Sequence, residues 1–284
     1  LNGNGFYDHR NDDAGEVAIY ALKAPLSLSR SSFYYPSATD ARIRSVVLPE
    51  AMFPEWNKSE QPIAERSLTN RSWPFSDNIA FANLNYSSST TIKMETKDDT
   101  QWFRKINMIT VQKELPIIVF YDSVVGKGAN IWSMPMMSDG AVNTPAGLIT
   151  PVKRIYHNSG EKQLPQATIQ KRLRPGLNRF VFTGQNWTAH PARGINWELY
   201  TYSQSPMDFT IADWGTSWQN TLEVNEFRKT NKRDYSEEQQ ILRLQSDQPF
   251  FNVLLPYSKD QNPYGNNIKI PFTGVLSIKQ NGQD

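Results

Sequence analysis

The sequence predicts an all-β protein, a large antiparallel β-sandwich (supersandwich) with long loops. Short runs of alternating apolar and polar residues recur at intervals of about 8–15 residues, separated by Pro, Gly and Asn, which is typical of sandwiches and barrels. Hydrophobic residues make up 38% of the chain and aromatic residues 12%. This composition suits many strands that each have one face in the core and one face exposed to solvent. The best helical pattern, at residues 53–68, is interrupted by Pro54 and Pro62.

The clearest single unit is a β-hairpin at residues 102–124. One β-rich run covers residues 103–111, a polar turn follows at 112–115, and a second run returns over 116–122. The second run is apolar at nearly every position, so we expect it in the middle of a sheet with both faces covered. Further strands are predicted at residues 16–22, 25–29, 79–84, 90–95, 131–136, 167–171, 179–182, 197–202, 209–214, 239–244, 250–255 and 274–278.

Length and composition limit the classes of protein that fit. The chain has 284 residues, with no repeat and no low-complexity linker, so we expect one β-sandwich domain over residues 1–284. The net charge is +2 and no long Lys/Arg run occurs, which argues against a nucleic-acid-binding surface. No apolar run approaches the ~20 residues of a membrane-spanning helix. The lack of cysteine excludes disulfides and thiolate zinc sites.

Few residues match a known catalytic or metal-binding motif. Residues 7–15 form the densest polar cluster, but they lack the Gly and distal Glu of a calcium loop, so we expect no metal there. The basic stretch at residues 228–233 is either a solvated loop or a clamp on an acidic polysaccharide. Of the eight tryptophans, most are expected in the core. Trp56 and Trp73 lie in Pro-rich loop sequence and are the candidates for stacking on a sugar.

Several of these segments together resemble the heparinase II/III-like β-sandwich of polysaccharide lyases. The run His9-Arg10-Asn11-Asp12-Asp13-Ala14-Gly15 is similar to the family's H-x-H-x-D-x-G motif. The strand at residues 18–26, followed by Ser31-Ser32-Phe33-Tyr34-Tyr35, is similar to the apolar strand and D-x-G-x-x-Y that come next in that family. The hairpin at 102–122 and the run at 251–256 resemble two later strands, so the likeness spans most of the chain through short motifs.

The resemblance implies β-elimination on a uronic-acid polysaccharide by a longer, secreted protein, periplasmic or extracellular. This chain would be its C-terminal β half, and an upstream α/α toroid would form the other wall of the substrate cleft. The resemblance gives catalytic roles to His9, Tyr34 and Tyr35, which would move protons to and from the sugar. Much of the family's machinery belongs to the toroid, so we expect little or no activity from this chain alone.

The chain departs from the family at the positions of the zinc ligands. Asn11 stands at the second His of the motif, residues 29–31 lack the Asp, and residues 42–44 lack the later His. A guanidinium cannot ligate zinc, so we expect no zinc and no other cofactor. Arg30, Arg42 and Arg44 would instead supply positive charge there, either to stabilise the loop or to bind a uronate carboxylate.

Two other functions stay open at this point. The chain is also compatible with a non-catalytic carbohydrate-binding module whose motif has decayed, or with a structural β-sandwich that has no sugar chemistry. A sandwich fold by itself hosts many functions.

Overall fold

The computed structural model describes residues 15–22, 24–27, 45–50, 75–84, 87–95, 100–112, 115–126, 128–138, 141–150, 167–183, 194–213, 239–258, 268–272 and 275–278. These residues form strands, turns and bends and contain no α-helix. The predicted all-β class is therefore confirmed. The predicted helical pattern at 53–68 lies outside the described residues.

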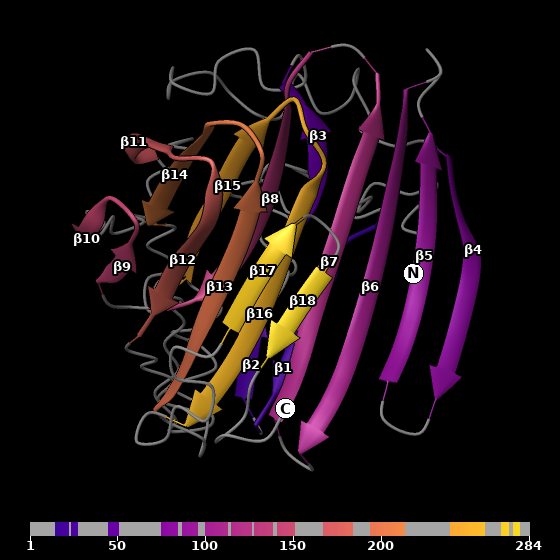
Figure 1. The fold of residues 1–284 in the computed structure, drawn as a ribbon, viewed down its shortest axis with the longest axis horizontal. Coiled ribbons are helices and arrows are strands. Elements are labelled where there is room, and N and C mark those ends of the chain that lie inside the picture. The colour runs from indigo at the N-terminus through magenta and orange to yellow at the C-terminus, as the bar shows by residue number, and fades with distance from the viewer. Residues whose placement is uncertain are drawn as a thin grey trace, which may run out of the picture.

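The larger of the two main sheets has nine antiparallel strands (Figure 1). In spatial order they are β10 (Gly147–Ile149), β9 (Val142–Thr144), β12 (Gly176–Phe182), β13 (Ile195–Ser203), β16 (Phe250–Ser258), β7 (Leu115–Val125), β6 (Gln101–Gln112), β5 (Ser87–Glu95) and β4 (Phe75–Leu84). The predicted hairpin is confirmed, since β6 pairs with β7 over nearly its whole length, and the two strands are the sixth and seventh in this order.

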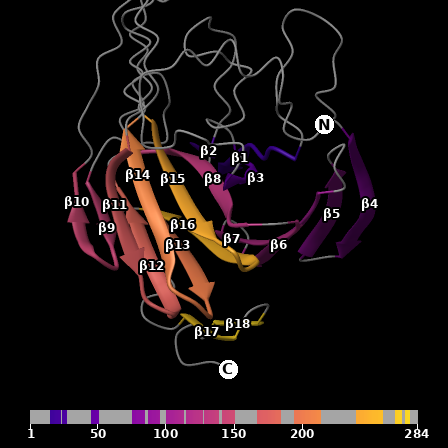
Figure 2. The same ribbon diagram turned by 90° about the horizontal axis from the view of Figure 1, so that it is seen from above.

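A five-stranded antiparallel sheet packs against one face of the larger sheet, which confirms the predicted sandwich (Figure 2). Its order is β11 (Ala167–Leu173), β14 (Met207–Asp213), β15 (Gln239–Ser246), β8 (Asn130–Met137) and β3 (Val47–Pro49). Two hairpins complete the described structure, β1 (Ile19–Ala21) with β2 (Ala24–Ser27) and β17 (Ile268–Phe272) with β18 (Val275–Ile278). The second hairpin lies on the side of the larger sheet that faces away from the smaller one.

The main apolar core lies between the two sheets. Phe180, Leu199 and Leu254 come from the larger sheet, and Trp132 and Phe209 come from the smaller one; all five are buried in one cluster. Trp102, Trp132 and Trp197 have no exposed surface, as expected for core tryptophans.

A second apolar cluster covers the opposite face of the larger sheet. Its members alternate along each strand with those of the main core, as the two faces of a strand require. On β7, Ile117 and Val119 belong to the second cluster, while Ile118 and Phe120 belong to the first. This confirms that β7 is a central strand with both faces covered.

The strands that sequence periodicity failed to identify are short. β3, β9 and β10 have three residues each, too few to show an alternation, and the prediction also missed β17. The strand expected over residues 16–22 is restricted to Ile19–Ala21. Leu22 has a φ of +52° and begins the turn into β2. Among the described residues, no helix is long and apolar enough to cross a membrane.

Two residues of β7 allow a direct test of the core. Phe120 is fully buried and meets the Trp132 ring edge-on at 6.4 Å between centroids. We expect Phe120→Ala to lower the free energy of unfolding by about 3–5 kcal/mol, because the side chain leaves a cavity. Val125 is 60% exposed, and Val125→Ala should change stability by no more than about 0.5 kcal/mol. Urea unfolding measures both, and similar losses would contradict this assignment of the core.

Candidate functional site

All the site residues predicted from the sequence lie outside the described residues. They are His9, Tyr34, Tyr35, Arg30, Arg42, Arg44, Trp56 and Trp73, and their roles therefore stay predictions. Most of them fall in two segments, residues 1–14 and 28–44. The described residues that border these segments are Gly15, Ser27 and Ser45. Two of these three residues, Gly15 and Ser45, contact the buried side chain of Arg104.

A buried ion pair lies beneath these borders. Arg104 on β6 and Asp122 on β7 face each other in the hairpin register and have no exposed side-chain surface. Arg104 donates from Nε to Asp122 Oδ1 at 2.7 Å and from Nη2 to Oδ2 at 3.2 Å. Such a bidentate pair fixes both the distance and the orientation of the two side chains.

The carboxylate of Asp122 is also bonded to two tryptophans. Trp102 on β6 donates its indole N–H to Oδ1 at 2.8 Å, and Trp132 on β8 donates to Oδ2 at 3.0 Å. Each oxygen thus accepts two hydrogen bonds, which offsets the large cost of burying the charge. Because Trp132 belongs to the five-stranded sheet, this carboxylate bonds the two sheets together.

The remaining nitrogen of Arg104 holds the backbone at both segment borders. Nη1 donates to the carbonyl oxygen of Gly15 at 2.8 Å and to that of Ser45 at 2.6 Å. The guanidinium is also stacked near two aromatic rings, 4.6 Å from the centroid of Trp102 and 5.6 Å from that of Phe120. With no exposed surface and with these bonds made, Arg104 cannot touch a substrate.

Gly15 fits this place because it has no side chain. Its φ is +78°, a backbone conformation that disfavours other residues. A Cβ atom here would come within 2.4 Å of Met94 Sδ and 2.8 Å of the Trp102 ring. The last residue of the predicted H-x-H-x-D-x-G motif is thus a close-packing glycine above the ion pair.

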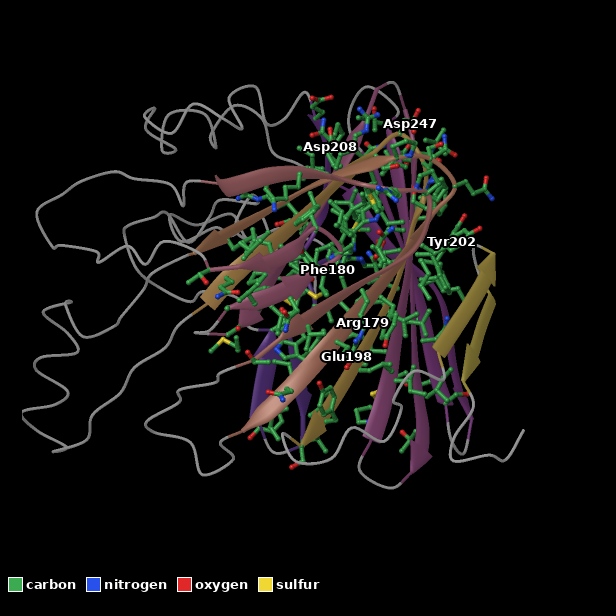
Figure 3. The ribbon with its side chains drawn as sticks, turned by 60° about the vertical axis from the view of Figure 1, so that its left-hand side comes forward. Arg179, Phe180, Glu198, Tyr202, Asp208 and Asp247 are labelled. Carbon is green, nitrogen blue, oxygen red and sulfur yellow. The ribbon has the colours of Figure 1, made fainter. Side chains whose placement is uncertain are left out.

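A second ionic cluster lies on the opposite face of the larger sheet (Figure 3). Glu198 on β13 is 1% exposed and binds Arg179 of β12 through both oxygens, with Nε to Oε2 at 2.9 Å and Nη2 to Oε1. Tyr200 donates its hydroxyl to Oε2 at 2.6 Å and Tyr257 of β16 donates to Oε1 at 3.3 Å. The cluster joins three neighbouring strands.

The two tyrosines of this cluster are poor candidates for a catalytic base. Burial raises the pKa of Tyr200 far above its ordinary value, and its hydrogen bond to Glu198 raises it further. Burial and the charge of Glu198 raise the pKa of Tyr257 to about 12. A base works best when its pKa lies near the operating pH, so this cluster is better suited to holding strands together than to proton transfer.

Neither of these clusters resembles a metal site. Within the described ranges, no three His, Asp or Glu side chains are grouped as metal ligands would be. The three histidines of the chain all lie outside those ranges.

The sequence contained a signal for the buried pair, although the sequence-based prediction did not use it. Arg104 lies between Trp102 and Ile106 on the inward face of β6, and Asp122 lies between Phe120 and Val124 on the inward face of β7. Opposite charges at inward, paired positions of an apolar hairpin indicate a buried ion pair. The further bonds of Arg104 to Gly15 and Ser45 cross 89 and 59 residues of sequence and leave no local pattern.

No protein-family model matches this chain, and no curated protein matches it. Among solved structures, a heparinase III, the BT4657 gene product with methylated lysines, matches 99% of this chain and 36% of its own length, at 11% identity and a TM-score of 0.51. A second structure of that gene product gives a TM-score of 0.49 at 12% identity, over 98% of this chain and 36% of its own. Heparan sulfate lyase HepC from Pedobacter heparinus gives 0.43 at 11% identity, over 92% of this chain and 32% of its own.

The first of these matches shows what the chain shares with known proteins. At this level of identity the match concerns the fold, and the chain has a heparinase III-like β-sandwich fold. The resemblance inferred from short motifs is thereby confirmed as a likeness of fold. The chain spans about a third of the length of the structures it matches.

Because of Tyr257 in the second ionic cluster, we expect the protein to lose stability at high pH. The pKa of Tyr257 is raised to about 12 in the folded protein, whereas a tyrosine in an unfolded chain ionises near pH 10, with a pKa of about 10. Above pH ~10 the unfolded chain therefore loses this proton first, and the free energy of unfolding falls until pH ~12. Below pH ~10 the contribution of Tyr257 is fully present.

Urea unfolding at a series of alkaline pH values measures this effect, and phenolate absorbance in the ultraviolet reports the ionisation. We expect Tyr257→Phe to show a smaller fall over this range than the wild type, because the variant has one shifted phenol fewer. An equal fall in both proteins would contradict the assignment.

Proposed function

We propose that this chain is the β-sandwich domain of a polysaccharide lyase that acts by β-elimination on a uronic-acid polysaccharide. The observation that carries the proposal is the match in fold to a heparinase III over 99% of this chain. The sequence adds the H-x-x-x-D-x-G run at residues 9–15, whose glycine packs against the buried ion pair. The 284 residues would form one domain of a secreted protein, periplasmic or extracellular.

The rest of the lyase would lie upstream of the sandwich. The matched heparinase III is about three times as long as the part that this chain covers. We propose an α/α toroid there, with the acidic polysaccharide bound in a cleft between the toroid and the sandwich. The activity would then require both parts.

The reaction needs three chemical roles. A base removes the proton from C5 of the uronate, the electrons form the C4–C5 double bond, the C4–oxygen bond breaks, and an acid gives a proton to the leaving oxygen. Positive groups must stabilise the carboxylate, where charge develops in the transition state. We assign proton transfer to His9, Tyr34 and Tyr35, the roles that the resemblance of their segments to the lyase family implies.

Substrate binding is assigned to arginines and exposed tryptophans. Arg30, Arg42 and Arg44 would pair with the sugar carboxylates, which guanidinium groups bind bidentately. Trp56 and Trp73 would offer ring faces to the sugar. Asn11 and these arginines stand where the family has zinc ligands, and a guanidinium cannot ligate zinc. No step of the proposed reaction therefore involves a metal.

Activity on a panel of polysaccharides tests the proposal. We expect the full-length protein to produce unsaturated uronate, detected by its ultraviolet absorbance, from one of alginate, heparan sulfate, hyaluronan or ulvan. The 284-residue chain alone should yield little or none. Binding without turnover in the full-length protein would favour a non-catalytic carbohydrate-binding module. Neither binding nor turnover would favour a structural sandwich.

Removal of two arginines tests the binding site separately. We expect Arg42→Ala/Arg44→Ala to weaken binding of an acidic oligosaccharide at least tenfold, which corresponds to about 1.4 kcal/mol, measured by calorimetry. The control is Lys105→Ala/Arg174→Ala, which removes the same charge from two exposed positions, one on β6 and one between β11 and β12. Equal affinity in the two double variants would contradict a specific role for Arg42 and Arg44.

A further inference from the structure

Two polar side chains of the larger sheet lie in the main core without a protein partner. Asn252 on β16 and Thr201 on β13 have no exposed surface. Within the described part of the chain, neither end of the Asn252 amide is hydrogen-bonded to another protein group, and the same holds for the Thr201 hydroxyl. Turning the amide over would not change this, because both its oxygen and its nitrogen lack a partner. A buried polar group in this state costs free energy, and here the cost falls on two residues.

The strand register places the two side chains next to each other between the sheets. Thr201 and Asn252 are paired directly across β13 and β16. Residues opposite each other in an antiparallel pair lie on the same face, with Cβ atoms about 4.5–5.5 Å apart. That face is the inner one, because Leu199 on β13 and Leu254 on β16, each two residues away, belong to the main core.

The flanking strands place other groups beside the pair. On β7, the residue opposite Asn252 is Phe120, whose ring is apolar. On β12, the residue opposite Thr201 is Asn178, whose amide nitrogen already donates to two backbone carbonyl oxygens at 3.0 and 3.2 Å. Neither neighbour is bonded to the pair through its polar side-chain atoms.

We propose that Asn252 and Thr201 together bind internal water between the two sheets. The amide and the hydroxyl supply both donors and acceptors, as water does. Buried water makes about three hydrogen bonds, typically to polar groups that are otherwise unpaired. The pair offers three such atoms, Nδ2 and Oδ1 of Asn252 and Oγ1 of Thr201.

The spacing and the charge of the pair both suit water. The polar atoms make no direct bond, but they extend from Cβ atoms about 5 Å apart and are therefore within reach of a bridging molecule. Both side chains are uncharged, so they would not offset the cost of burying an ion. The ligand is therefore neutral and small, and it both donates and accepts hydrogen bonds.

Substitutions of similar shape distinguish bound water from unpaired groups by the sign of their effect. If the pair holds water, Thr201→Val removes one of its bonds, and we expect the equilibrium constant for unfolding to rise about fivefold or more. Asn252→Leu should act in the same direction. If the groups have no partner at all, each substitution removes a buried polar group without loss, and the constant stays the same or falls. Urea unfolding measures both variants.

The double variant Thr201→Val/Asn252→Leu tests whether both residues bind the same water. It leaves no polar group to hold the water, so we expect a rise in the unfolding constant clearly smaller than the product of the two single rises. The control is Asn252→Leu/Val125→Ala. Val125 is 60% exposed and lies five residues beyond Phe120 on β7, so the two effects should multiply, as those of distant residues do.

Stabilisation by either single variant would overturn the binding of water. Multiplying effects of Thr201→Val and Asn252→Leu, as in the control, would overturn the shared site.

A high-resolution crystal structure of the wild type locates the water directly and remains decisive if Asn252→Leu fails to fold. We expect density for a water molecule within about 3.2 Å of Thr201 Oγ1 and of one end of the Asn252 amide. A direct bond between the two side chains, with no density between them, would overturn the proposal.

Discussion

The carboxylate of Asp122 is the group on which the described structure depends most. It lies in the main core, with no exposed surface, and accepts hydrogen bonds from Arg104, Trp102 and Trp132. A buried charge without these donors would cost several kcal/mol. The same bonds orient the guanidinium that holds Gly15 and Ser45 and connect β7 to β8 in the other sheet. One side chain thus couples the packing of the sheets to the borders of the predicted site.

Each face of the larger sheet has a buried carboxylate that is bound to an arginine, but the two carboxylates connect different parts of the chain. Between the sheets, Asp122 and Arg104 connect strands to backbone far away in sequence. On the opposite face, Glu198 connects three adjacent strands through Arg179, Tyr200 and Tyr257. In both clusters the carboxylate oxygens are already bonded to donors, so neither carboxylate is available as a catalytic base. The catalytic roles proposed for His9, Tyr34 and Tyr35 rest instead on the resemblance of their segments to the lyase family.

Much of the fold could be predicted from the sequence, because its central strands are long and regular. The hairpin of β6 and β7 shows alternation, and the apolar run at residues 116–122 correctly indicated a strand covered on both faces. Three-residue strands such as β3 and β9 are defined by pairing with distant partners rather than by their own pattern. Likewise, the opposite charges of Arg104 and Asp122 can be read in the hairpin sequence, but the bonds of Arg104 to Gly15 and Ser45 depend on the tertiary fold.

A shared sandwich does not determine a substrate, since one fold hosts many functions. The arginines of the chain bear on which substrate it could bind. Arg42 and Arg44 stand within three residues of Ser45, and Ser45 is fixed to the buried guanidinium of Arg104. Elimination on a uronic acid needs a group that accepts the C5 proton. The cluster on the opposite face of the larger sheet does not supply one, because its carboxylate is already bound to Arg179 and Tyr200 and because burial raises the pKa of its phenols.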